Sequence, residues 1–216
     1  MSNVNSDTSD TTKTPEAFPG GSPGPGGLTV ITGCSGTGKT QAALHFAQEP
    51  GSVFFAGDED ETVLRRKAAS LGLDVANTTF IHNTSKDISN EMLEVLVLVK
   101  RCLTVPTVKR VVIDDFNRLT GLAASLWASG LQQLAADSEA HILVTLQTRR
   151  PASKAPNLAG ATKRETPLAL SHSATNVIHL DSPFDTRPTG VLVKSGTLLL
   201  HQVPDELFGV KLRTES

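Results

Sequence analysis

The chain has 216 residues, which is enough for one α/β domain with a substantial buried core. Its apolar fraction of 38% is ordinary for a globular protein, and its formal charge of −2 excludes a strongly basic protein whose whole surface attracts nucleic acid. Two cysteines are too few for a disulfide framework, so we expect a reduced, cytoplasmic setting. We expect no membrane partner, because no apolar run reaches the ~18 residues of a membrane helix and the N-terminus lacks the order of a signal peptide.

The first part of the chain differs in composition from the rest. Residues 1–24 combine Ser, Thr, Asn, Asp, Gly and Pro with almost nothing to bury, which predicts a disordered tail. Residues 25–216 are predicted to form one domain in which strands and helices alternate. Apolar and β-branched runs predict strands at 28–32, 52–56, 78–81, 110–113, 141–146, 177–180, 191–194 and 197–201. Helical spacing predicts helices at 41–48, at 61–71, after Asp87 and at 118–136.

This alternation predicts the fold class. It indicates a three-layer α/β domain with a mainly parallel central sheet covered on both faces, and with ligands at the carboxyl ends of the strands. The last two predicted strands are joined through Ser195-Gly196, so they are expected to form a C-terminal β-hairpin.

A phosphate-binding motif follows the first predicted strand. Residues 33–40 match the P-loop pattern Gly-x-x-x-x-Gly-Lys-Ser/Thr and open a predicted helix, as the mechanism requires. The glycines let successive backbone N–H groups point at one anion, and the helix N-terminus adds partial positive charge. Lys39 is expected to reach the β- and γ-phosphates of ATP, and the Thr40 hydroxyl to hold Mg²⁺. The whole predicted phosphate cradle is Gly33, Cys34, Ser35, Gly36, Thr37, Gly38, Lys39 and Thr40.

Carboxylates end two of the predicted strands. Asp114 follows the apolar run 110–113, where an aspartate that organises Mg²⁺ must lie. Asp58 and Glu59 follow the strand 52–56, and a carboxylate in the same cleft could orient and deprotonate the attacking water. Alternatively, these acids could complement the dipole of the next helix, and Asp115 could be the base.

This layout resembles the RecA/DnaB/KaiC group of P-loop ATPases, and RadA-like members in particular. The similarity covers about residues 24–202 and is carried by the segments 26–33, 53–60 and 141–147. It implies a RecA-like fold and ATP hydrolysis. It also implies that the catalytic carboxylate falls on Asp58 or Glu59, with Asp58 the better aligned, and that Gln147 senses the γ-phosphate.

The resemblance also implies an oligomer, either a hexamer or a filament, with nucleotide at subunit interfaces. Lys194 matches the lysine of a Lys-x-Arg element that reaches a neighbouring subunit's nucleotide. Ser195 and Gly196 stand where the arginine would be expected, so an arginine finger would have to come from elsewhere, with Arg187 a candidate.

A polar segment follows Gln147. It has no acid from 148 to 164 and holds five cations: Arg149, Arg150, Lys154, Lys163 and Arg164. In the RecA group this position is a DNA-binding loop, so the resemblance implies contact with single-stranded nucleic acid. The segment has no aromatic residue to stack on bases, which limits the expectation to binding of the phosphate backbone. A solvated surface loop or a subunit contact is the alternative.

Three functions agree with these features. The first is an ATPase acting on nucleic acid, of the helicase, translocase, recombination or repair type. The second is a KaiC-like regulator switched by nucleotide, and the third is a P-loop kinase of a small molecule. The strand-end Gln147 favours hydrolysis over the kinase.

Overall fold

The computed structural model describes residues 26–57, 59–82, 88–114, 121–148, 173–180, 188–195 and 206–213. In these ranges the helices are α1 (Lys39–Ala47), α2 (Glu61–Ser70), α3 (Ile88–Leu103) and α4 (Gly121–Ser138). The strands are β1 (Leu28–Gly33), β2 (Ser52–Ala56), β3 (Thr79–His82), β4 (Arg110–Asp114), β5 (His141–Gln147), β6 (Asn176–Leu180), β7 (Thr189–Ser195), β8 (Glu206–Leu207) and β9 (Val210–Arg213). No helix in the described part of the chain is long and apolar enough to cross a bilayer.

All the strands of the described residues belong to one sheet, in the order β3-β2-β4-β5-β1-β6-β7-β9-β8. Every neighbouring pair from β3 to β6 is parallel, whereas the pairs β6–β7 and β8–β9 are antiparallel. The parallel arrangement brings the carboxyl ends of β1, β2, β4 and β5 to one edge of the sheet. Ligands of open α/β sheets bind at this edge.

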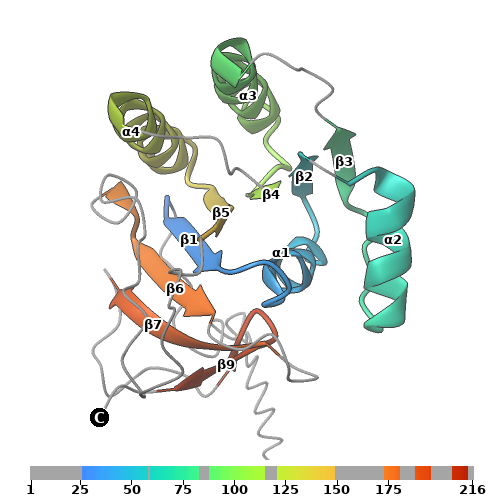
Figure 1. The fold of residues 1–216 in the computed structure, drawn as a ribbon. Helices are drawn as coiled ribbons and strands as arrows, with labels where there is room; N and C mark the ends of the chain where they lie inside the picture. The colour runs from blue at the N-terminus through green and yellow to red at the C-terminus, as the bar shows by residue number, and fades with distance from the viewer. Residues whose placement is uncertain are drawn as a thin grey trace, which may run out of the picture.

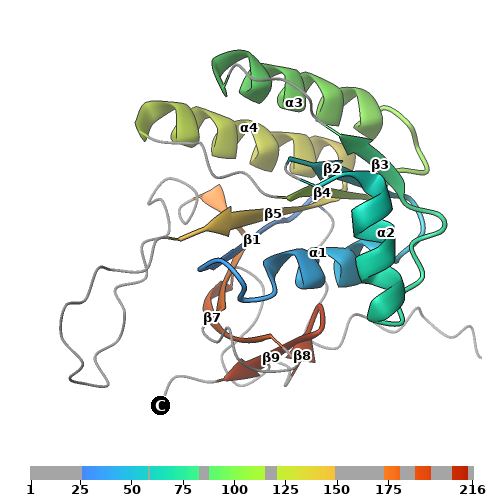
Figure 2. The same cartoon turned by 45° about the vertical axis from the view of Figure 1, so that its right-hand side comes forward.

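Helices cover both faces of the sheet (Figures 1 and 2). On one face, α3 and α4 bury Val95, Val99, Trp127 and Leu131 against alternate residues of the strands. On the other face, α1 and α2 share a second core with the β8–β9 segment, which lies on the far side of α1 from the parallel strands (Figure 2). Strand residues alternate between these two cores because the side chains of a strand have a period of two.

The predicted fold class is confirmed: the structure is a three-layer α/β fold with a mainly parallel sheet. The predicted strand 52–56 coincides with β2, and most other boundaries differ by one to three residues. The largest difference is in the predicted helix 118–136, since α4 begins three residues later and spans Gly121–Ser138. The second strand of the predicted hairpin through Ser195-Gly196 lies outside the described residues. The predicted tail 1–24 and Asp87 lie outside them as well.

A second hairpin, which the sequence did not predict, lies at the C-terminal end. Strands β8 and β9 are joined by Phe208 and Gly209, whose φ angles of 52° and 70° have the sign pattern of a type I′ turn. The left-handed conformation is costly for Phe208, but its ring is buried and packs edge-to-face on Phe46 of α1, with ring centroids 5.2 Å apart. Phe46 also meets the ring of His141, whose pKa burial lowers to about 3, so that this imidazole is neutral in the core.

Gly209→Ala is expected to destabilise the protein more than Gly72→Ala does. Both glycines have φ near 70°, which costs a residue with a side chain about 1–2 kcal/mol. A Cβ at Gly72 would meet open space, whereas a Cβ at Gly209 would overlap the ring of His45 on α1. Overpacking of this kind adds about 1–3 kcal/mol.

Urea unfolding of both variants measures this difference directly. The additional His45→Ala substitution should recover part of the loss in Gly209→Ala and none in Gly72→Ala. Equal free energies of unfolding for the two glycine variants would show that the hairpin does not pack on α1.

Candidate nucleotide-binding site

The P-loop connects the carboxyl end of β1 to the start of α1. Gly38 precedes α1 with a left-handed φ of 91°, and a Cβ there would come within 2.8 Å of the Pro188 side chain. Both the backbone conformation and the close approach therefore require glycine. In the described structure no side chain caps the start of α1. The first-turn N–H groups of this helix are oriented for an anion.

Lys39 is the first residue of α1 and is only 7% exposed. Its Nζ donates to the Cys34 carbonyl oxygen at 3.0 Å, and the Thr37 hydroxyl donates to the same oxygen at 2.9 Å. The loop thus folds around the lysine, and its ammonium group is held within it. A positive charge so far from solvent is stabilised by a nearby anion.

Asp114 is the last residue of β4 and is 6% exposed. The period of two places it on the same face as Val112, which packs in the core shared with α1. The Thr145 hydroxyl donates a hydrogen bond to the Asp114 carboxylate. Burial raises the pKa of the Asp114 carboxyl, whereas hydrogen bonding by Thr145 and Thr40 and the charge of Lys39 act in the opposite direction.

Thr145 was not among the predicted site residues. It lies on β5, the strand beside β4, and its buried hydroxyl fixes the Asp114 carboxylate. The signal that could have found it is a polar residue inside an otherwise apolar strand, because a buried hydroxyl requires a partner.

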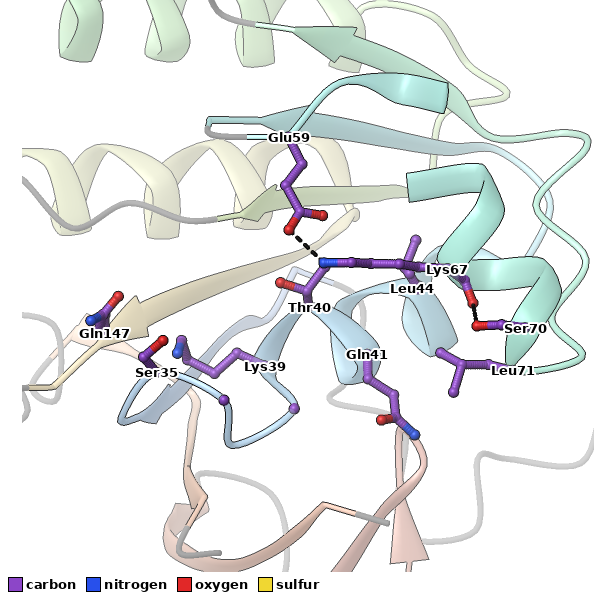
Figure 3. Close-up of a pocket in the computed structure, with 12 residues that line it drawn as sticks. Ser35, Lys39, Thr40, Gln41, Leu44, Glu59, Lys67, Ser70, Leu71 and Gln147 are labelled. Atoms are coloured by element: carbon purple, nitrogen blue, oxygen red, sulfur yellow. Dashed lines mark hydrogen bonds and ion pairs between the residues drawn. The ribbon is translucent and has the colours of Figure 1, made fainter. Parts of the chain in front are cut away.

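A cavity of about 530 Å³ opens above the P-loop, a volume typical of small-molecule sites. Figure 3 shows the side chains around it. Lys39, Glu59 and Gln147 line this cavity together, from α1, from the turn before α2 and from the end of β5. The other lining residues are Ser35, Gly36, Gly38, Thr40, Gln41, Leu44, Lys67, Ser70 and Leu71.

Gln147 is positioned by the pairing of β5 with β1. It lies opposite Gly33 in the sheet, and the next residue, Thr148, donates its N–H to the Gly33 carbonyl at 3.0 Å. The end of β5 is therefore tied to the first residue of the P-loop. A change in the loop would reach Thr148, the residue after Gln147, through this hydrogen bond.

Thr40 and Asp114 have the donor atoms that Mg²⁺ prefers. Thr40 lines the cavity, and the Asp114 carboxyl lies close enough for Thr40 to lower its pKa. Hard oxygen ligands of this type, completed by phosphate oxygens, bind Mg²⁺ in nucleotide sites. The residues present therefore fit the predicted metal.

Several predicted site residues fall outside the described part of the structure. Lys194 belongs to β7, but its side chain is not described. The others are Asp58, Asp115, Arg149, Arg150, Lys154, Lys163, Arg164 and Arg187. Of the carboxylates considered for water activation, Glu59 is the one that the structure describes, and it lines the cavity.

Comparison with solved structures relates this geometry to a known fold. The chain is similar to the crystal structure of the RadB recombinase, with a TM-score of 0.60 and 20% sequence identity over 81% of this chain and 84% of that chain. No protein-family model matches the sequence, and no curated protein matches it either. The similarity shows that the chain has a RecA-like P-loop fold.

Proposed function

We propose that this protein hydrolyses ATP at the P-loop and uses that cycle to act on nucleic acid, as a motor of the helicase or translocase type or of the recombination and repair type. The observation that carries the proposal is the convergence of Thr40, at the start of the P-loop helix, and the buried Asp114 at the end of β4, where Thr40 acts to lower the pKa of the carboxyl. This convergence joins the phosphate cradle to a metal-binding carboxylate. A glycine-rich turn without a nucleotide would have no need of it.

In the proposed mechanism the chain's own groups bind and orient the triphosphate. The backbone N–H groups of the P-loop and the Lys39 ammonium hold the β- and γ-phosphates. Thr40 and Asp114 would hold Mg²⁺, which, when bound, would neutralise charge on the phosphate oxygens. Glu59 accepts the proton of the attacking water as the bond between the γ-phosphorus and its bridging oxygen breaks. Gln147, at the end of β5, senses the γ-phosphate by a hydrogen bond to it.

The same edge of the sheet supports the link to nucleic acid. The basic segment begins directly after Thr148, whose backbone is bonded to Gly33 of the P-loop. Its cations would contact phosphates of a single strand, and their attachment to β5 would couple strand binding to Gln147. An oligomer, with Lys194 directed at a neighbouring nucleotide, belongs to the same proposal.

A regulator switched by nucleotide, in the style of KaiC, is the second candidate. The observation that favours it is Ser195-Gly196 in place of the arginine of a Lys-x-Arg element. An arginine finger contributes about 10³–10⁵-fold in rate, so a site without one turns over slowly. ATPase assays with and without single-stranded DNA and RNA, together with native mass measurements, separate the two: strand stimulation supports the motor, and slow turnover unaffected by strands supports the regulator.

Replacing Arg149, Arg150, Lys163 and Arg164 with alanine is expected to weaken binding to single strands and to remove strand stimulation of the ATPase. If all five cations met phosphates, the logarithm of affinity would fall with the logarithm of salt concentration with a slope of about −3.5, at ~0.7 per contact. The quadruple variant should give a much shallower slope in a fluorescence-anisotropy salt titration. Basal turnover should remain, because the cavity residues are unchanged.

Lys100→Ala/Arg101→Ala serves as a control, since these cations lie in the last turn of α3, which packs on the face of the sheet opposite α1. Unchanged affinity of the quadruple variant across the titration would assign the segment to a solvated surface and would favour the regulator.

A further inference from the structure

Glu59 is held by a lysine from the neighbouring helix. The Nζ atom of Lys67 lies 2.5 Å from Oε1 of Glu59, and both residues line the cavity above the P-loop (Figure 3). The second carboxylate oxygen, Oε2, is buried and has no hydrogen-bond partner within the described residues. One oxygen of the carboxylate is thus anchored by Lys67 and the other is enclosed by the protein, so the carboxylate is held in one orientation.

The local structure of α2 explains how Lys67 reaches this position. Asp60 caps the helix by accepting from the Val63 N–H, so the turn that carries Glu59 is joined rigidly to the helix start. Side chains of a helix lean toward its N-terminus, which directs the long Lys67 side chain back along α2 toward Glu59. Leu64 and Ala68 bury the neighbouring face of the helix and fix its rotation.

Arg65 fixes α2 from a third direction. Its guanidinium donates to the carbonyl oxygens of Val75 at 2.9 Å and Thr78 at 3.3 Å, and it stacks over Phe80 of β3. The helix is therefore tied to the sheet edge by contacts independent of Lys67. Removal of the Lys67 ammonium should leave α2 in place.

The small free energy expected from the Lys67–Glu59 ion pair argues against a role in folding. The side chains of Lys67 and Glu59 are 46% and 35% exposed, and ion pairs at such positions contribute about 0–1 kcal/mol to stability. The position of the pair matters more than its energy. Glu59 shares the site with the Asp114 carboxylate, which it repels, and the Lys67 charge offsets the accumulation of negative charge beside the phosphates.

We propose that Lys67 is the positioning residue of Glu59: it binds one carboxylate oxygen and thereby fixes the carboxylate beside the cavity in which the attacking water would lie. This inference rests on the proposed ATP hydrolysis and deepens it. It assigns a role to a residue of α2 that does not touch the reacting atoms. Without the ammonium, Glu59 rotates freely, and a displacement of about 1 Å in a reacting group can cost about 10²-fold in rate.

Lys67→Met, which keeps the length of the side chain and removes its charge, is the test. We expect kcat to fall about 10–100-fold while KM for ATP is unchanged, because Lys67 acts on the base and not on substrate binding. Lys67→Arg, which restores a cation, should recover most of the rate. Arg66→Met is the matched control, since it removes a neighbouring exposed cation of α2 and should leave kcat unchanged.

A double-mutant cycle with Glu59→Gln distinguishes positioning from a merely structural role. If Lys67 acts through Glu59, the double variant should have the same kcat as Glu59→Gln alone. The inference would be overturned if the losses in kcat of the two single variants multiplied in the double variant. An unchanged kcat in Lys67→Met, with or without a raised KM, would overturn it as well. The proposed function would survive these outcomes if wild-type turnover still depended on Lys39, whereas a wild type without such turnover would overturn both.

Discussion

Lys39→Ala is expected to eliminate measurable ATP hydrolysis while leaving the protein folded. The wild-type ammonium is held inside the P-loop, where it would meet the β- and γ-phosphates. Loss of a single preorganised donor at a developing charge costs about 10²–10³-fold in kcat, and Lys39 supplies a full charge in a site shielded from water. Release of phosphate in the presence of Mg²⁺ measures the effect.

The fold should tolerate this substitution for a local reason. Alanine is a strong helix former, and α1 is held in the core by other residues, chiefly Ala42, Ala43 and Phe46. Circular dichroism and thermal unfolding check this directly. Lys100→Ala, on the solvent-exposed side of α3, is the control and should retain wild-type turnover. Turnover by Lys39→Ala at the wild-type rate would refute the proposed function.

Thr40 and Asp114, the proposed metal-binding pair, are expected to be needed for turnover as well. Thr40→Ala and Asp114→Asn should each lose Mg²⁺-dependent turnover, because the first removes a hydroxyl oxygen donor and the second removes the negative charge of the carboxylate. Compared with Lys39→Ala, these variants separate the effect of losing the metal from the effect of losing the lysine that would bind the phosphates.

Glu59→Gln is expected to lower kcat by about 10²–10⁴-fold with ATP affinity retained, since a positioned general base contributes that much. The amide is nearly isosteric with the carboxylate but cannot accept the proton. Because Glu59 lines the cavity while the P-loop would supply the phosphate contacts, ATP binding and turnover should respond differently to this substitution. Equilibrium binding of a fluorescent ATP analogue and steady-state hydrolysis are the two measurements.

Three further variants test the assignment of the base. Glu61→Gln is the matched control, because Glu61 pairs with Arg65 at an exposed position and does not line the cavity. Asp58→Asn and Asp115→Asn test the two other candidate carboxylates. If only one of these abolishes hydrolysis and Glu59→Gln does not, the base is not Glu59, and the role proposed for Lys67 fails with it.

Features that depend on local chemistry were accessible from the sequence. The P-loop was one, because glycines, a lysine and a helix start lie within eight consecutive residues. The apolar runs that became β1, β2, β4 and β5 were others, since strands buried on both faces read as continuous apolar segments. Gly72 likewise marked the end of α2: it follows Leu71 with a φ of 71°, and the Leu73 N–H bonds to the Ala68 carbonyl at 3.0 Å, as in a Schellman motif.

The C-terminal hairpin was not accessible in this way. Its two-residue turn uses Phe208-Gly209 where Asn-Gly or Asp-Gly would be the usual signal, and β8 is only two residues long. Its stability comes from the packing of Phe208 on Phe46, more than 160 positions earlier in the chain. No local pattern could have indicated that contact.

The composition of the site was likewise decided in three dimensions. The sequence by itself determined that a phosphate cradle and strand-end carboxylates exist, because each is written in adjacent residues. Only the tertiary structure joined Thr145 to Asp114 across 31 positions and Lys67 to Glu59 across a helix start. The physical reason is that sheet register and the rotation of α2 determine which side chains meet, and both are set by burial of whole faces against distant segments.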